Sequence, residues 1–149
     1  DISSDLSFKQ YAVDDMVRQV IRKYAKIFIS KKIKMNFKPT GRYIVTDDKW
    51  FVFVLEQLIS NALKYTKKGQ ISIYMKEKSL VIEDTGIGIP AEDLPRIFEK
   101  GFTGYNGREN KKSTGIGLYL CKNIMDKLQW NITADSEVGR GTKIYLTKM

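Results

Sequence analysis

Residues 80–90 read Leu-Val-Ile-Glu-Asp-Thr-Gly-Ile-Gly-Ile-Pro. Three consecutive apolar residues followed by Glu83 are typical of a buried strand, and this strand delivers one carboxylate, Asp84, at its end. Gly86 and Gly88 follow at a spacing of two, and glycine lets a backbone approach a flat ligand closely. A carboxylate can accept a hydrogen bond from an exocyclic amine. The stretch therefore indicates either a site for a flat, amine-bearing ligand or an ordinary strand that ends in a glycine turn.

The hydrophobic periodicity on both sides of this stretch predicts helices mixed with strands. Helices are expected at residues 14–28, 48–65 and 115–128, with a short helical stretch at 92–98. Strands are expected at residues 10–13, 33–38, 42–45, 71–76, 80–83, 131–135 and 142–146. This order predicts an α/β fold, in which helices pack on one face of a mixed sheet. Residues 85–114 are mostly loop, and this segment is longer than a simple connection between two elements requires.

The helix expected at residues 48–65 carries two adjoining stripes. One stripe is apolar and predicts a core face; it consists of Phe51, Leu55, Leu58, Ile59 and Ala62. The other stripe is polar, follows the same period about a third of a turn away, and consists of Gln57, Asn61, Lys64 and Tyr65. Two amides, an ammonium and a phenol suit a polyphosphate and its metal, and asparagine is a mediocre helix former that needs a reason to stand mid-helix. An exposed polar face is the alternative.

Two further segments contain closely spaced glycines. Residues 113–118 read Ser-Thr-Gly-Ile-Gly-Leu and open the third long helix. A helix N-terminus offers unpaired backbone N–H groups and a positive dipole end, which suit a phosphate, although a flexible helix start looks the same. Residues 139–142, Gly-Arg-Gly-Thr, read as a hairpin turn. The P-loop and Rossmann glycine patterns are absent, so a nucleotide site here would be of another design.

The composition excludes several kinds of site. The 149 residues contain no histidine and one cysteine, Cys121. Histidine metal ligands, imidazole bases, Ser-His-Asp triads and cysteine-based zinc sites are therefore excluded. Cys121 lies in an apolar helical pattern, which predicts a buried, unreactive thiol in a reducing compartment.

The net charge of +9 raises the question of an anionic partner. Residues 1–78 hold 16 Lys/Arg against 8 Asp/Glu, whereas residues 79–149 hold 10 against 9. The surplus, in runs such as residues 31–34, could contact DNA or anionic lipid, or could form a solvated face. A solvated face is favoured, because no aromatic residues alternate with these lysines as base stacking requires. No apolar run is long enough for a membrane span. A start at Asp1 rather than Met suggests a piece of a longer protein, although a processed tag would give the same start.

Taken together and in this order, these segments resemble the catalytic domain of sensor histidine kinases, a branch of the GHKL ATPase superfamily that includes gyrase, Hsp90 and MutL. The matching segments are residues 57–66 (the asparagine box), 84–88 (the first glycine box), 96–102 (the phenylalanine box, which distinguishes the kinases), and 114–118 and 139–142 (the later glycine boxes). Residues 101–108, Gly-Phe-Thr-Gly-Tyr-Asn-Gly-Arg, are particularly similar to BceS-like kinases, which respond to cell-envelope stress in Gram-positive bacteria.

The resemblance implies a single domain over residues 1–149 with the Bergerat fold. In that fold a mixed, mostly antiparallel sheet and helices on one face form a two-layer sandwich, and a flexible lid, here about residues 100–113, covers ATP. Asp84 would accept a hydrogen bond from the adenine amino group, and Asn61 would ligate Mg²⁺. The implied ATP-binding residues are Asn61, Lys64, Tyr65, Asp84, Gly86, Gly88, Ile89, Lys100, Thr103, Arg108, Lys111, Thr114, Gly115, Ile116, Gly117, Leu118 and Thr142. Arg108, Lys111 or Lys112 would face the γ-phosphate.

The implied catalytic residues are Asn61, Glu56 and Gln57. Kinases of this family usually have asparagine at the position of Gln57, and the hydrolytic members have a glutamate base there. Gln57 cannot deprotonate water, which fits a domain that transfers phosphate to another group. Whether Gln57 contacts the metal directly or through water stays open. Glu56 is a candidate base towards the incoming histidine.

The resemblance also implies the partners. The acceptor histidine would lie on the protein's own upstream dimerisation domain, and a response regulator would receive the phosphate from it. We expect the fragment to be monomeric and not to label itself, the full-length protein to be a homodimer anchored in a bacterial membrane with this domain in the cytoplasm, and no nucleic acid to bind. Three alternatives remain. The first is an anti-sigma serine kinase of the same superfamily, against which the phenylalanine box and the start at a residue other than Met argue. The second is a DNA- or membrane-binding module, and the third is a degenerate pseudokinase that does not bind ATP, against which the presence of every box residue needed for ATP argues.

Overall fold

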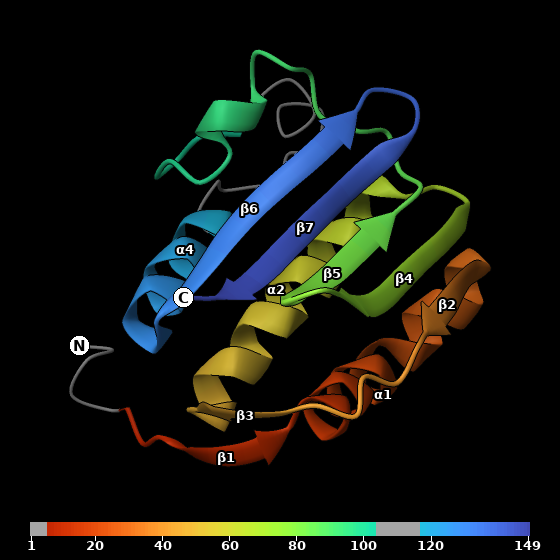
Figure 1. The fold of residues 1–149 in the computed structure, drawn as a ribbon. Helices are drawn as coiled ribbons and strands as arrows, with labels where there is room; N and C mark the ends of the chain where they lie inside the picture. The colour runs from red at the N-terminus through yellow and green to blue at the C-terminus, as the bar shows by residue number, and fades with distance from the viewer. Residues whose placement is uncertain (1–5, 104–116) are drawn as a thin grey trace.

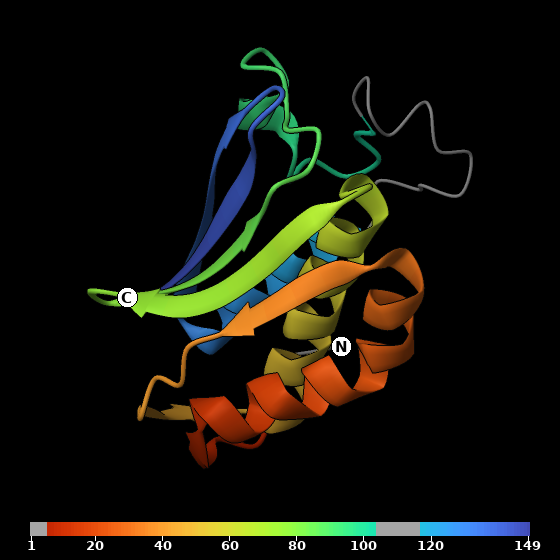
Figure 2. The ribbon, with the colours of Figure 1, turned by 90° about the vertical axis from the view of Figure 1, so that its right-hand side faces the viewer.

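The computed structural model describes residues 6–103 and 117–149, in which three long helices cover one face of a five-stranded sheet (Figures 1 and 2). The helices are α1 (Val13–Lys31), α2 (Asp48–Tyr65) and α4 (Gly117–Leu128), and a single 3-10 turn, η2, spans Leu94–Arg96. The strands are β1 (Lys9–Ala12), β2 (Ile33–Phe37), β3 (Tyr43–Thr46), β4 (Gly69–Lys76), β5 (Ser79–Asp84), β6 (Trp130–Glu137) and β7 (Gly141–Lys148). The two-layer α/β fold expected from the sequence is confirmed.

The main sheet has the strand order β2-β4-β5-β7-β6, and only the β2–β4 pair is parallel. The sheet is therefore mixed and mostly antiparallel, as expected. The strands expected at residues 10–13 and 42–45 were wrongly assigned to this sheet. They form β1 and β3, which pair with each other as a separate antiparallel ribbon below the sheet in Figure 1. Within the described ranges, no helix combines the length and apolarity needed to cross a membrane.

Helix α2 runs through the centre of the molecule because both its ends are fixed and its apolar stripe is buried. Asp47 caps its start, with Oδ1 accepting a hydrogen bond from the Trp50 N–H at 3.1 Å. At its other end the Lys31 ammonium, from the last turn of α1, donates to the Leu63 carbonyl. The expected core face is confirmed, since all its members are at most 4% exposed: Phe51, Leu55, Leu58, Ile59 and Ala62. Burial also raises the pKa of the Cys121 thiol to about 12, as expected for an unreactive cysteine.

A carboxylate at the start of α1 fixes the turn before β3. Asp14 accepts hydrogen bonds from the Thr40 N–H at 2.8 Å, the Thr40 hydroxyl at 2.7 Å and the Gly41 N–H at 3.0 Å. Burial acts to raise the pKa of Asp14, but these donors and the Arg18 charge outweigh it and hold the pKa below its usual value. The ionised form of Asp14 therefore stabilises the fold.

We expect Asp14→Asn to lower the free energy of unfolding by about 1.5–3 kcal/mol at pH 7, because hydrogen bonds to a charged group contribute about that much. A lowered pKa in the folded state means that the stabilisation is complete above the unfolded value of about 3.9. The stabilisation is lost as the pH falls through the pKa that Asp14 has in the folded state. Urea unfolding at pH 7 and near pH 3 measures both. The control is Asp15→Asn, one residue along on an exposed position, which should change stability by about 0.5 kcal/mol or less. An equal effect of both variants at pH 7 would contradict the prediction.

Candidate functional site

Asp84 ends strand β5 next to β7, where it pairs with Thr142. Its Oδ1 accepts hydrogen bonds from the Gly86 N–H at 2.9 Å and the Thr142 N–H at 3.2 Å. Among the described residues, Oδ2 has no hydrogen-bond partner. Burial, and to a smaller extent the charge of Glu83, raise the pKa of Asp84, while the two N–H donors oppose the shift. The carboxylate is therefore fixed in position through one of its two oxygens.

The loop that follows Asp84 is held on two sides by backbone hydrogen bonds. The Ile87 N–H donates to the Tyr65 carbonyl at the end of α2 at 3.1 Å, and the Gly139 N–H, in the turn between β6 and β7, donates to the Ile87 carbonyl at 2.9 Å. A Cβ on Gly86 would lie 2.4 Å from the Tyr65 carbonyl oxygen, and one on Gly88 would lie 2.2 Å from the carbonyl oxygen of Glu137. The nearest neighbours of both glycines are thus protein backbone groups.

Two residues with hydroxyl side chains also lie at this site, although the sequence did not identify them as candidates. Ser136 Oγ accepts from the Ile89 N–H at 2.8 Å, donates to the Gly141 carbonyl at 2.8 Å, and lies 2.8 Å from Thr142 Oγ1. Thr66 is fully buried, and its hydroxyl has no partner among the described residues. That hydroxyl lies 2.9 Å from the position a Cβ on Gly86 would occupy.

Sequence signals for both hydroxyls exist but are weak. Ser136 is the cross-strand partner of Thr142, which follows only once the register of the hairpin around Gly139 is known. Thr66 directly follows the last residue of α2, where its burial depends on the loop that returns to it from β5.

The polar stripe of α2 connects this loop to the start of α4. Gln57 Oε1 lies 2.9 Å from the position that a Cβ on Gly117, the first residue of α4, would occupy. Asn61 follows one turn later and Tyr65 another turn later, each step rising about 6 Å along the axis. The ammonium of Lys64 lies 5.7 Å from the centre of the Tyr65 ring. The stripe therefore runs from α4 at one end to the Asp84 loop at the other.

Glu56 has a cation partner of its own. Its carboxylate forms an ion pair of 2.7 Å with the Lys23 ammonium of α1 and is only 20% exposed. The hydrogen bond to Glu56, followed by its charge, raises the pKa of Lys23. A role for Glu56 as a base would require it to compete with this ion pair, and that role stays a prediction.

The expected phenylalanine box begins at Arg96, the last residue of η2. Ile97 is buried and Phe98 packs against the core, while the Arg96 guanidinium lies 4.4 Å from the centre of the Phe102 ring. The Lys100 ammonium lies 5.9 Å from the centre of the Tyr119 ring of α4, so this segment reaches the same helix as Gln57.

The remaining expected ligands are distributed as follows. Thr103, half-buried, is the last described residue before the gap, and Leu118 packs its side chain against the core. Six expected ligands or alternatives lie outside the described residues: Arg108, Lys111, Lys112, Thr114, Gly115 and Ile116.

Comparisons with known proteins agree with this arrangement. Residues 46–149 match the family described as "Histidine kinase-, DNA gyrase B-, and HSP90-like ATPase". The chain is 36% identical to the sensor histidine kinase YxdK and 35% identical to the sensor protein BceS, both of Bacillus subtilis; these matches cover 97% and 98% of the chain and 48% and 45% of the relatives. It is 42% identical to the sensor protein kinase GraS of Staphylococcus aureus, over 70% of the chain and 31% of that protein. The chain thus spans about half or less of each of these relatives.

Solved structures show the same fold at low sequence identity. The histidine kinase ShkA, in complex with AMPPNP, superposes with a TM-score of 0.80 at 18% identity, over 97% of this chain and 32% of that one. The catalytic domain of the histidine kinase ThkA superposes with a TM-score of 0.77 at 20% identity, over 95% of both chains. The expected similarity to BceS-like sensors is confirmed by the sequence matches. With two thirds of its length matched, the chain belongs to the family of histidine kinase-, DNA gyrase B- and HSP90-like ATPases.

Proposed function

We propose that this chain binds Mg-ATP and donates the γ-phosphoryl group to a histidine on another domain of a sensor kinase. The observation that carries the proposal is the Asp84 carboxylate, which is fixed through Oδ1 and has Oδ2 without a partner among the described residues. It stands beside the loop that contacts the end of α2, the helix of the polar stripe. Oδ2 would accept the adenine amino group, and the unpartnered hydroxyl of Thr66 fits a site that receives a polar ligand.

The polar stripe fits the phosphates and their metal. The described residues contain no group of three or more His, Cys, Asp or Glu that could hold a metal by themselves. An ion bound through the Asn61 amide oxygen would therefore take most of its ligands from phosphate and water, which suits Mg²⁺. When bound, the metal neutralises phosphate charge, and phosphoryl transfer requires mainly such neutralisation and positioning. Lys64 and Tyr65 would contact phosphate and nucleotide, with Lys100, Arg108 and Lys111 supplying further charge from the lid.

The acceptor lies elsewhere, because the chain contains no histidine. We place it on an upstream dimerisation domain of the same protein, a homodimer that passes the phosphate to a response regulator and is anchored in the membrane with this domain in the cytoplasm. The relatives named as sensor kinases are about twice as long as the matched region, which leaves room for such parts. We propose that residues 1–149 form a single, monomeric domain.

We expect Asp84→Asn to weaken Mg-ATP binding about ten- to a hundredfold in isothermal titration calorimetry, because a hydrogen bond to a charged group contributes about 1.5–3 kcal/mol. Asn61→Ala should reduce the dependence of ATP affinity on Mg²⁺. Asp135→Asn is the matched control, an exposed aspartate on β6 of the same sheet, and should leave the affinity unchanged. Unchanged affinity in both Asp84→Asn and Asn61→Ala would rule out this nucleotide site.

The acceptor is tested separately. Incubation with labelled ATP should not label the chain itself, whereas a supplied helical dimerisation domain should acquire acid-labile phosphate on histidine. Acid-stable phosphate on a serine of a small protein would instead support an anti-sigma serine kinase.

A further inference from the structure

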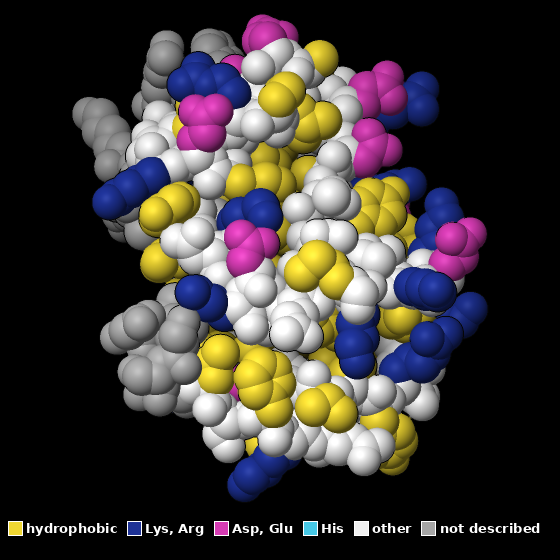
Figure 3. Space-filling model, turned by 60° about the vertical axis from the view of Figure 1, so that its left-hand side comes forward, with side chains coloured by type: hydrophobic (Ala, Val, Ile, Leu, Met, Phe, Trp, Pro, Cys, Tyr) yellow, Lys and Arg dark blue, Asp and Glu magenta, His cyan; other side chains and the backbone are white. Residues whose placement is uncertain are grey.

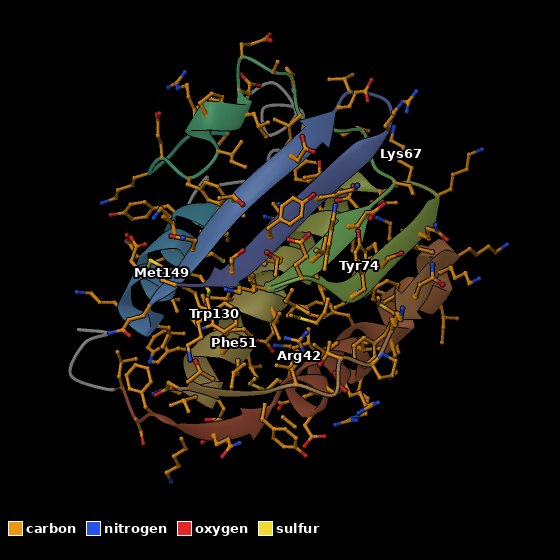
Figure 4. The ribbon with its side chains drawn as sticks, in the orientation of Figure 1. Arg42, Phe51, Lys67, Tyr74, Trp130 and Met149 are labelled. Carbon is orange, nitrogen blue, oxygen red and sulfur yellow. The ribbon has the colours of Figure 1, made fainter. Side chains whose placement is uncertain are left out.

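A cavity of about 370 Å³ lies at the opposite end of the sheet from Asp84. It opens between the main sheet and the β1–β3 ribbon, where Figure 4 labels Arg42, Phe51, Trp130 and Met149. Leu80, in its wall, is the second residue of β5, the strand that Asp84 ends. Four steps along the strand separate the two residues by about 13 Å. The cavity is therefore separate from the proposed nucleotide site.

The interior of the cavity is apolar. Phe51 of α2 and Trp130 of β6 meet edge to face, with ring centres 5.3 Å apart and planes at 70°. Both rings are buried. The other apolar wall residues come from the start of α1, from β3, from β4 and β5, and from the position after β7: Val13, Ile44, Met75, Leu80 and Met149. A volume in the range of small-molecule pockets, roughly 300–1,000 Å³, together with apolar walls, fits an alkyl chain.

The charged side chains that line the cavity are all cations. Arg42, Lys78 and Lys148 line it, all three are exposed, and no Asp or Glu does so. None of the three forms an ion pair with a described residue, since the ion pairs there involve other cations. Figure 3 shows apolar surface across the lower part of one face, with Lys and Arg side chains beside it. Unpaired cations around an apolar cavity favour an anionic head group on an apolar tail.

We propose that this cavity binds a free single-chain amphiphile with an anionic head, of the chemical class of a medium-chain carboxylate. The tail lies among Ile44, Met75 and Met149, the apolar wall residues that keep accessible surface, above the buried ring of Phe51. The head lies among Arg42, Lys78 and Lys148. Because Ile44 belongs to β3 and Met75 to β4, the ligand bridges the ribbon and the main sheet. Nothing in the proposed kinase reaction requires this ligand.

The probe is a series of carboxylates from hexanoate to decanoate, titrated into the chain below the micelle concentration. Each added methylene should raise the affinity about fourfold until the cavity is full, since burying one methylene contributes about that factor. Decanol and decyltrimethylammonium should bind more weakly than decanoate. Arg42→Gln and Lys148→Gln should each weaken decanoate binding about two- to fivefold, as expected for exposed charges. Lys26→Gln, on the exposed face of α1, removes the same charge elsewhere and should have no effect.

The position of the ligand is tested by nuclear Overhauser effects in solution. Decanoate should show them to the methyl groups of Ile44 and Leu80, and a saturating concentration of ATP should not remove them. Contacts with Ile29 instead, which is 77% exposed on α1, would mean non-specific adsorption and would overturn the proposal. Displacement by ATP, no dependence on chain length, or binding to phosphatidylglycerol vesicles but not to free decanoate would also overturn it.

Discussion

Phe51→Ala should lower the free energy of unfolding by about 3–5 kcal/mol, the cost of truncating a large aromatic residue in a packed core. Phe51 has no exposed surface and lies on the face of α2 that the sheet covers. Its ring also contacts Trp130 of β6 edge to face, a geometry that contributes beyond buried area alone. Because the residue already borders a cavity, the surroundings would gain further empty space instead of collapsing onto the missing ring. For a chain of this size, the midpoint of thermal unfolding should fall by about 6–20 °C.

The matched control for this variant is Phe53→Ala, two residues along the same helix. Phe53 is only partly buried and meets Trp50 at a ring distance of 6.0 Å. The substitution removes the same ring with the same change in helix propensity, so it should cost distinctly less than Phe51→Ala. Chemical denaturation of both variants, followed by circular dichroism, gives the comparison. Equal losses of stability in the two variants would show that α2 turns a different face towards the sheet.

The periodicity of apolar residues in the sequence predicted which residues are buried, and the prediction was accurate for α2. The expected stripe from Phe51 to Ala62 is the stripe that the structure buries. The period of the apolar residues shows which side chains share one face of a helix or strand, and this period depends only on the local geometry of the backbone. The length of α1 was underestimated because its final turn, up to Lys31, carries mainly polar or exposed residues.

The pairing of strands could not be predicted in the same way. β1 and β3 are no longer than β2, and nothing in their own residues distinguishes them from strands of the main sheet, yet they pair only with each other. Which strands become neighbours depends on contacts distant in sequence, such as the parallel pair of β2 with β4. Ser136 was missed for the same reason, since its contact with Thr142 depends on the register of β6 against β7. The cavity behind Phe51 also arises only when five or more elements meet.

The two glycines of the first glycine box lie in the loop that follows Asp84, and their environment differs from the expectation. The sequence suggested that they leave space for a flat ligand. In the fold, Gly86 lies against the end of α2 and Gly88 against the turn between β6 and β7. Their absent side chains let the loop fit between two parts of the protein and so fix the position of Asp84.

Gly88→Ala should therefore destabilise the fold by about 2–5 kcal/mol and also weaken Mg-ATP binding. Gly88 has φ +78, which costs about 1–2 kcal/mol for a residue with a side chain. The new Cβ would in addition lie 2.2 Å from the carbonyl oxygen of Glu137, and overpacking of this kind costs about 1–3 kcal/mol. Because the neighbour is backbone rather than a flexible side chain, the loop itself must move, and the adjoining Asp84 moves with it.

Gly139→Ala separates the steric effect from the strain. Gly139 has a similar φ of +85, and a Cβ there meets nothing within 4 Å. Its N–H, which donates to the Ile87 carbonyl, is kept in alanine. The free energy of unfolding of this variant should fall only by the backbone strain of about 1–2 kcal/mol. The variant should bind Mg-ATP like the parent chain. Urea unfolding and calorimetric titration of the two variants measure both quantities. If Gly139→Ala weakened nucleotide binding as much as Gly88→Ala, the contact between Gly88 and Glu137 would not be what holds Asp84 in position.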